Sequence, residues 1–155
     1  MKIVLTGISA TPYAREYISN VGRTLRERGH QVFIPHEGSW QPPQKPADTD
    51  RFDFEATYQS LKDADLLMAV LDGYIVDDAV AAQLGTFHAH AREGTRPRRI
   101  IGILHDTRVA GWDWAGGDKA LTPQIRQIIL SLGKIYPNFK QAFAALDTEP
   151  QSAKV

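Results

Sequence analysis

The chain reads LLMAVLDGYIVDDAVAAQLGTFHAH from Leu66 to His90, and this segment indicates how the protein folds. Its apolar opening, Leu66–Leu71, is too short for a helix and is typical of a strand buried on both faces of a parallel sheet. Asp72-Gly73 breaks the strand, and the paired acid Asp77-Asp78 precedes an Ala-rich stretch with apolar residues at helical spacing. We therefore expect a strand, an acidic loop and a helix N-terminus, the place where open parallel sheets bind ligands.

The rest of the chain alternates in the same way. Five segments have the composition of strands: Lys2–Leu5, Gln31–Ile34, Leu66–Leu71, Ile100–Leu104 and Lys134–Tyr136. Helices are expected over residues 12–28, 51–64, 123–132 and 139–146, besides the one that begins near Asp78. This alternation predicts an α/β fold with one doubly wound, five-stranded parallel sheet, Rossmann-like or flavodoxin-like, with helices on both faces.

Two of these helices have apolar stripes that should face the sheet. The stripes are Tyr17, Val21 and Leu25 in the first, and Phe54, Tyr58 and Leu61 in the second. Thr11-Pro12 is a typical N-cap and first helical residue, and Gly29 is a typical stop.

Length and composition limit the function classes. The 155 residues, 43% of them hydrophobic, suit one domain, expected over residues 1–146 with a polar tail at 147–155. Lys plus Arg equals Asp plus Glu at 18 each, so no charge excess points to nucleic acid or to a membrane surface. No apolar run is long enough to cross a bilayer, and the absence of Cys is compatible with the cytoplasm, where we expect the protein.

The loop Gly7–Thr11 joins the first strand to the first helix. Its free N–H groups and the hydroxyls of Ser9 and Thr11 suit a phosphate or a sugar oxygen, although capping the helix explains these residues equally well. A Gly-x-Gly-x-x-Gly or Walker pattern is absent, which argues against a dinucleotide or triphosphate site.

Three further segments have compositions that bear on function. The Pro-rich stretch Ser39–Asp50, with Trp40, is expected to be a loop that either closes over a flat ligand or packs on the protein surface. The basic stretch Arg92–Arg99 is interpreted as a solvated turn rather than a phosphate site. His88 and His90 are two residues apart and do not share a helix face, so no metal is predicted, and His105 is the histidine best placed for a ligand.

The acidic loop resembles the nucleoside 2-deoxyribosyltransferase family, whose pattern is a hydrophobic strand, Leu-Asp-Gly, an Asp and Glu-Leu-Gly. This chain has Leu71-Asp72-Gly73, Asp77 and Gln83-Leu84-Gly85. In the family the Glu is the nucleophile that attacks the anomeric carbon, and this chain has Gln83 there. A family Asp that precedes the central strand by two turns corresponds to Thr57, with Glu55 nearby.

The resemblance implies strand order 2-1-3-4-5 and an enzyme that acts on the N-glycosidic bond of nucleosides or nucleoside monophosphates. Transfer of 2-deoxyribose between nucleobases is the family's usual reaction, and hydrolysis to free base is the alternative. Asp77 would be the acid or base for the nucleobase, with Asp78 capping the helix beside it. The expected substrate-binding residues are Gly7, Ser9, Thr11, Asp72, Gly73, Asp78, Asp106 and Arg108. A homo-oligomer is implied, with a nucleoside or its monophosphate and a free nucleobase as small-molecule partners, and with no cofactor, nucleic acid or membrane.

Gln83 leaves three interpretations open, because a neutral amide is a poor nucleophile and cannot form the glycosyl ester. The chain can carry a deliberate Glu-to-Gln change that traps a ligand. It can hydrolyse the bond by direct attack of water, with Asp77 or Asp78 as general base. It can also be a module that binds nucleotides without turnover.

Overall fold

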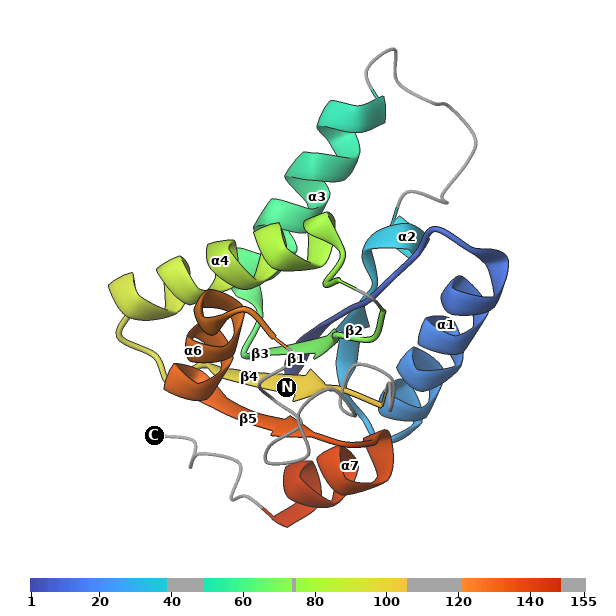
Figure 1. Cartoon of the computed structure of the whole chain (residues 1–155). Coiled ribbons are helices and arrows are strands. Elements are labelled where there is room, and N and C mark those ends of the chain that lie inside the picture. Colours follow the sequence, from blue (N-terminus) through green and yellow to red (C-terminus); the bar gives the residue numbers. More distant parts are fainter. Residues whose placement is uncertain (39–48, 74, 106–120, 149–155) are drawn as a thin grey trace.

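The computed structural model describes residues 1–38, 49–73, 75–105 and 121–148 (Figure 1). The strands are β1 (Lys2–Thr6), β2 (Gln31–Phe33), β3 (Leu66–Val70), β4 (Arg99–Ile103) and β5 (Gly133–Tyr136). The helices are α1 (Pro12–Glu27), α2 (Pro35–Gly38), α3 (Thr49–Asp63), α4 (Asp78–Glu93), α6 (Pro123–Leu132) and α7 (Phe139–Thr148). The expected strands and helices are all present with small shifts at their ends, and α2 is an additional turn where a simple end to β2 was expected.

The five strands form one parallel sheet in the order β2-β1-β3-β4-β5, which confirms the predicted fold class and strand order. β3 lies at the centre, with Leu67 opposite Val4 of β1 and Ile100 of β4. Every residue of β3 is buried, as expected for a central strand with both faces covered.

Helices cover both faces of the sheet, and each face has its own core. One core packs α1 and α7 against the sheet, with Ile18, Leu25 and Leu146 among its buried residues. The other packs α3, α4 and α6 against the opposite face, with Leu61 and Phe87 among its members. The sheet is therefore the middle layer of three, as in doubly wound folds (Figure 1).

Helix α1 begins and ends as its sequence predicts but faces the sheet differently. Thr11 is the N-cap, its hydroxyl accepting a hydrogen bond from Ala14 N at 3.2 Å, and Gly29 has a φ of +83° that favours glycine. The expected burial of Tyr17 was wrong, because this side chain is 45% exposed and its neighbour Ile18 is buried. A Cβ on Gly22 would lie 2.4 Å from Ile34 Cδ1, so Gly22 permits a close approach of the buried stripe of α1 to Ile34.

Helix α3 extends beyond the sheet at its N-terminal end (Figure 1). Leu61, near the C-terminal end, is buried, whereas Phe54 is 66% exposed, so the prediction of one buried stripe holds only where the helix lies over the strands.

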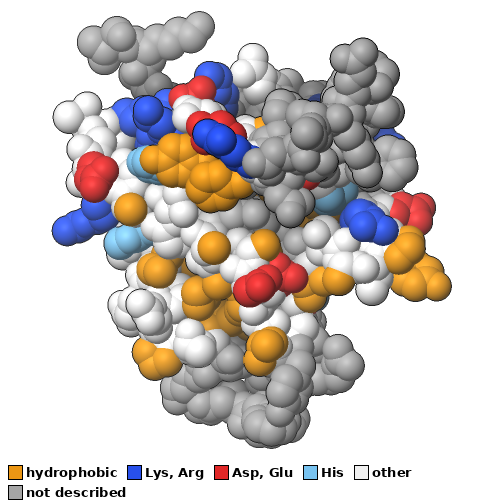
Figure 2. Space-filling model, turned by 90° about the horizontal axis from the view of Figure 1, so that it is seen from above, with side chains coloured by type: hydrophobic (Ala, Val, Ile, Leu, Met, Phe, Trp, Pro, Cys, Tyr) orange, Lys and Arg blue, Asp and Glu red, His pale blue; other side chains and the backbone are white. Residues whose placement is uncertain are grey.

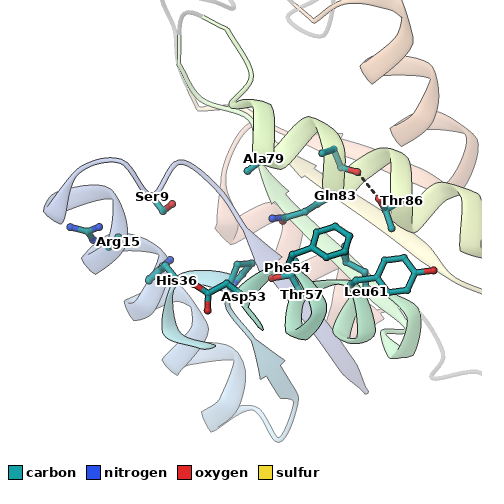
Figure 3. A pocket seen from close by; sticks show the side chains of 13 residues that line it. Ser9, Arg15, His36, Asp53, Phe54, Thr57, Leu61, Ala79, Gln83 and Thr86 are labelled. Carbon is teal, nitrogen blue, oxygen red and sulfur yellow. Dashed lines mark hydrogen bonds between the residues drawn. The ribbon is translucent and has the colours of Figure 1, made fainter. Parts of the chain in front are cut away.

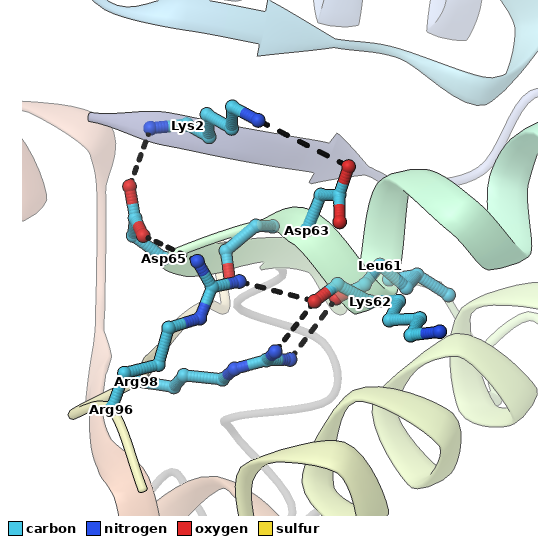
Figure 4. Close-up of polar contacts among 8 residues, drawn as sticks. Lys2, Leu61, Lys62, Asp63, Asp65, Arg96 and Arg98 are labelled. Atoms are coloured by element: carbon cyan, nitrogen blue, oxygen red, sulfur yellow. Dashed lines mark hydrogen bonds and ion pairs between the residues drawn. The ribbon is translucent and has the colours of Figure 1, made fainter. Parts of the chain in front are cut away.

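Two arginines bind the C-terminal end of α3 (Figure 4). Arg96 Nη2 donates to the carbonyls of Lys62 and Ala64, at 3.1 and 3.0 Å, and Arg98 Nη2 donates to Lys62 O at 2.5 Å. Carbonyls in the last turn of a helix lack helical hydrogen-bond donors, and these guanidinium groups act as the donors. Asp65 joins the same cluster, accepting from Lys2 N at 2.8 Å and pairing with Arg96 at 3.3 Å. Arg96 and Arg98 therefore stabilise the fold. The interpretation of Arg92–Arg99 as a solvated turn was wrong for these two side chains.

The C-terminal part differs little from expectation. Asn138 Oδ1 accepts from Gln141 N at 2.9 Å, so Asn138 caps α7. The helix continues to Thr148, which lies past the expected start of the polar tail at residue 147. Residues 149–155 of that tail and the predicted Trp40 loop, apart from its last residues at the start of α3, lie outside the described residues.

Charged side chains of both signs are interspersed on the face seen from above (Figure 2), in line with equal numbers of acidic and basic residues. Within the described residues, no helix is long and apolar enough to span a membrane.

Candidate functional site

The acidic loop after β3 is fixed to the end of β4. Asp72 Oδ1 accepts a hydrogen bond from the backbone N of His105 at 2.6 Å, and Asp72 Oδ2 lies 2.6 Å from His105 Nδ1. The Tyr17 hydroxyl lies 3.2 Å from His105 Nε2, which extends the chain of polar contacts to α1. Burial and the negative charge of Asp72 raise the pKa of Tyr17 above its usual value. Asp72 and His105 are thus bonded to each other at the edge where a ligand was expected.

The two acids before α4 both serve its N-terminus. Asp77 is the N-cap, with Oδ1 accepting from Ala79 N at 3.0 Å and Val80 N at 3.4 Å, and Asp78 Oδ1 accepts from Ala79 N at 2.8 Å. The expectation that Asp78 caps the helix and leaves Asp77 free was therefore wrong. Asp78 is already the first residue of the helix. Asp77 lies just outside the helix, and from there its side chain reaches the backbone N–H groups of the second and third helical residues.

A cavity of about 490 Å³ lies between α3, α4, α2 and the loop after β1 (Figure 3). This volume is in the usual range for small-molecule sites, roughly 300 to 1,000 Å³. Its lining residues are Ser9, Arg15, Pro35, His36, Asp53, Phe54, Thr57, Tyr58, Leu61, Ala79, Ala82, Gln83 and Thr86. The cavity therefore brings together Gln83 and Ser9, two of the site residues that the sequence predicted.

Gln83 lies on α4 directly beside the stripe of Val80, Leu84 and Phe87 that packs into the core, and its side chain lines the cavity at the edge of that stripe. Its Oε1 atom is buried and has no hydrogen-bond partner among the described residues. A buried acceptor without a donor costs free energy, on the order of 1 to 3 kcal/mol. Gln83 is therefore poised to accept a hydrogen bond from a bound ligand or water.

Asp53 is a site residue that the sequence reasoning missed. It lines the cavity from α3, and its Oδ1 atom is buried without a partner among the described residues. Thr57 and Leu61 also line the cavity, so the three residues form one i, i+4, i+8 stripe. The sequence offered one signal for Asp53. The family resemblance points to Thr57, and Asp53 lies one helical turn before it. The other nearby candidate, Glu55, is exposed and accepts a hydrogen bond from Gln59 at 2.8 Å.

The other end of the cavity is cationic. Arg15, Ser9 and His36 line it, and the hydroxyl of Ser19 lies 3.2 Å from His36 Nε2. Burial lowers the pKa of His36, assisted by the positive charge of Arg15 and opposed by Glu37 and by a hydrogen bond to the Arg15 backbone. The lowered pKa favours the neutral form of His36, so the positive charge that suits this end to an anion comes from Arg15.

Several predicted residues are not among those that line this cavity: Gly7, Thr11, Asp72, Gly73, Asp77 and Asp78. Gly7 permits close packing, because a Cβ there would lie 2.8 Å from Ile18 Cδ1, and Gly73 has a φ of +124°. Asp106 and Arg108 lie outside the described residues. No cluster of three or more potential metal ligands occurs in the described part of the chain.

Similar solved structures share this architecture, although no protein-family model and no curated protein matches the sequence significantly. A conserved protein from Enterococcus faecalis V583 has a TM-score of 0.76 at 17% identity, over 95% of this chain and 97% of its own. The 2-deoxyribosyltransferase of Bacillus psychrosaccharolyticus has a TM-score of 0.65 at 20% identity, over 94% of this chain and 96% of its own. This chain has the fold of a 2-deoxyribosyltransferase.

A second enzyme has the same fold. The CMP N-glycosidase of Clostridium botulinum has a TM-score of 0.56 at 18% identity, and the match covers 95% of this chain and 99% of the glycosidase. The 2-deoxyribosyltransferase fold thus spans nearly the whole chain, and the cavity lies at the end of the sheet where such folds bind ligands.

Proposed function

We propose that the chain is a member of the nucleoside 2-deoxyribosyltransferase family that hydrolyses the N-glycosidic bond of a nucleoside monophosphate and releases the free base. One observation carries this proposal: a single cavity holds Gln83, at the position of the family nucleophile, together with the cationic end formed by Arg15, Ser9 and His36. A monophosphate has the matching parts, an anion at one end and a glycosidic bond in the middle.

Gln83 favours hydrolysis over transfer. Breaking an N-glycosidic bond develops positive charge on the sugar ring, and a double displacement needs a carboxylate that bonds to the anomeric carbon. An amide cannot form that bond, whereas direct attack by water needs no covalent intermediate. The unpartnered Oε1 of Gln83 is suited to orient a water molecule or a sugar hydroxyl.

The cationic end supports a phosphate on the substrate. Arg15 forms no ion pair with a carboxylate in the described ranges of the chain, so its guanidinium charge is available to a ligand. Guanidinium groups bind phosphate through charge-assisted hydrogen bonds, and the Ser9 hydroxyl beside it adds a donor.

An aromatic wall supports a flat base. Phe54 lines the cavity and is 66% exposed, and its ring stacks on Tyr58 with centroids 6.0 Å apart and planes inclined by 21°. An exposed aromatic face beside a polar cavity is a suitable surface for a nucleobase.

Transfer of 2-deoxyribose is the second candidate function. It is supported by the similarity of fold to the Bacillus psychrosaccharolyticus enzyme and by Gln83-Leu84-Gly85, which keeps the size of a Glu-Leu-Gly motif. In this candidate Gln83 replaces a catalytic Glu. A nucleotide-binding module without turnover is the remaining alternative.

Liquid chromatography with a full mass balance separates these functions. The protein is incubated with nucleoside monophosphates and deoxynucleosides, each with and without a second free base. Release of base without an acceptor supports hydrolysis, and a new nucleoside that forms only with an acceptor supports transfer. Ligands that raise the melting temperature without either product would indicate a binding module.

A further inference from the structure

Asp53 brings a carboxylate to the wall of the cavity that contains Gln83. Among the described residues that line this cavity, Asp53 is the acidic one, Arg15 is the cation, and His36 is the remaining ionisable group. The acids expected from the sequence, Asp72, Asp77 and Asp78, are bonded to His105 or to the N-terminus of α4. If a carboxylate among these lining residues acts as the base in hydrolysis, that carboxylate is Asp53.

The two sides of the cavity each present a buried hydrogen-bond acceptor. Asp53 and Gln83 come from α3 and α4, two helices that pack together, and both side chains face the cavity (Figure 3). Asp53 Oδ1 and Gln83 Oε1 are both buried acceptors that lack a donor in the described structure. A bound water molecule has two O–H groups to donate, and a sugar adds hydroxyls, so a hydrated substrate would satisfy both atoms.

We propose that Asp53 is the general base that activates the attacking water, with Gln83 orienting that water, which rests on the proposed hydrolysis. As the water oxygen bonds to the anomeric carbon, Asp53 takes one of its protons. The carbon–nitrogen bond breaks, its electron pair stays on the base nitrogen, and solvent protonates the departing base. Asp53 then returns its proton to solvent, so the reaction consumes one water and yields sugar phosphate and free base.

The closing experiment compares the intact chain with Asp53→Asn and with the matched control Glu55→Gln. Glu55 lies on the same helix and carries the same charge but is exposed outside the cavity. The rate of base release from a nucleoside monophosphate is measured from pH 4 to pH 9, together with the dissociation constant for the product sugar phosphate. A positioned base is worth about a hundredfold or more in rate.

We expect Asp53→Asn to lower kcat at least about a hundredfold, to change the dissociation constant by less than about threefold, and to abolish the fall of kcat at low pH that protonation of the base imposes. Glu55→Gln should behave like the unchanged chain. His36 titrates in the same cavity, and any change of kcat with pH that His36 causes should persist in both variants. Formate should restore base release to Asp53→Ala, because it returns a carboxylate to the space that the substitution opens.

Two outcomes overturn the assignment. If the unchanged chain releases base and Asp53→Asn does so within about threefold, the proposed hydrolysis stands and Asp53 is not its base. If the unchanged chain binds monophosphates and releases no base from any of them, the proposed hydrolysis fails and the role of Asp53 fails with it. Formate rescue keeps the assignment testable should Asp53→Asn fold poorly, because a merely structural carboxylate would not restore kcat through an added anion.

Discussion

His105 and Asp72 are joined at both carboxylate oxygens, one through the backbone N and one through Nδ1, each at 2.6 Å. This contact ties the carboxyl ends of β3 and β4 together and removes Asp72 from the set of acids available to a ligand.

We expect Asp72→Asn to lower the free energy of unfolding by about 1 to 3 kcal/mol, because an amide can accept from only one of the two donors and hydrogen bonds to charged groups are the stronger ones. Urea denaturation measures this loss. Asp63→Asn is the control, since Asp63 is exposed and its contact with Lys2 is 4.0 Å long. A change of under about 0.5 kcal/mol is expected there, and equal losses in both variants would contradict the prediction.

Gln83→Glu should convert the chain into a transferase if the scaffold retains the family chemistry. A carboxylate at this position can bond to the anomeric carbon, and a second base can then resolve the intermediate. We expect a new deoxynucleoside to form at least about tenfold faster than with Gln83, measured by liquid chromatography with a free acceptor base. Gln83→Met is the control, because it keeps the length of the side chain without an oxygen. No gain with Glu would show that Gln83 does not stand in for a nucleophile.

Arg15→Met should weaken the binding of monophosphates selectively. Loss of a charge-assisted hydrogen bond costs about 1.5 to 3 kcal/mol, which corresponds to a rise in Kd of about tenfold to a hundredfold. The Kd of the matching nucleoside should stay within about threefold. Isothermal titration with the two ligands checks this difference, and Arg23→Met on the exposed side of α1 provides the control. Equal weakening of both ligands would place the phosphate elsewhere.

Phe54→Ala should raise the Kd for substrates with large bases without loss of stability. Its ring is 66% exposed, so its removal deletes a stacking surface but leaves no core cavity. We expect a rise of about threefold to tenfold for a purine monophosphate, a smaller rise for ribose 5-phosphate, and an unchanged melting temperature. A large fall in melting temperature would indicate that Phe54 supports the fold instead.

Stability should decrease as the pH falls below about 6.5. Burial lowers the pKa of both His36 and His30, so below that pH the unfolded chain binds protons that the folded chain does not, and stability rises with pH in this window. His36→Asn should flatten the decrease between about pH 6.5 and 5, and His30→Asn should add to the effect. Urea midpoints across this range measure it, and an unchanged slope in the double variant would contradict the assignment.

A monophosphate should act in the opposite direction on His36. Its negative charge near the imidazole favours the protonated form, so binding should raise the pKa of His36 from its lowered value. Titration of the His36 ring protons by NMR, with and without ligand, checks this shift, and His30 is the internal control.

The sequence predicted the sheet more completely than the site. Leu66–Leu71 is apolar without interruption, and a buried central strand is the structure that such a run favours, so fold class and strand order followed from it and from the family resemblance. Thr11-Pro12 likewise sets the start of α1 through local hydrogen bonding. Such features depend on neighbours in the chain, which the sequence displays directly.

Features that depend on packing between distant segments were missed. Tyr17 and Ile18 are both apolar, and only the packing of α1 shows that Ile18 is the one that faces the sheet. Helical spacing places Asp53 on the same stripe as Thr57, but only the packing of α3 against α4 shows that this stripe lines the cavity. Asp77 and Asp78 are adjacent in the sequence. Only the observed start of α4 at Asp78 shows that Asp77 is the N-cap.

Arg96 and Arg98 hold α3 at the end remote from Asp53 and Phe54, through main-chain carbonyls that every residue type provides. The hydrogen bonds that hold the C-terminal end of α3 therefore do not depend on which side chains the N-terminal half of this helix presents to the cavity. Substitutions at positions 53, 54 and 57 can alter which ligand is preferred while the anchoring bonds stay the same. Descendants of this chain can thus acquire new substrates through changes in that half of the helix, at little risk to folding.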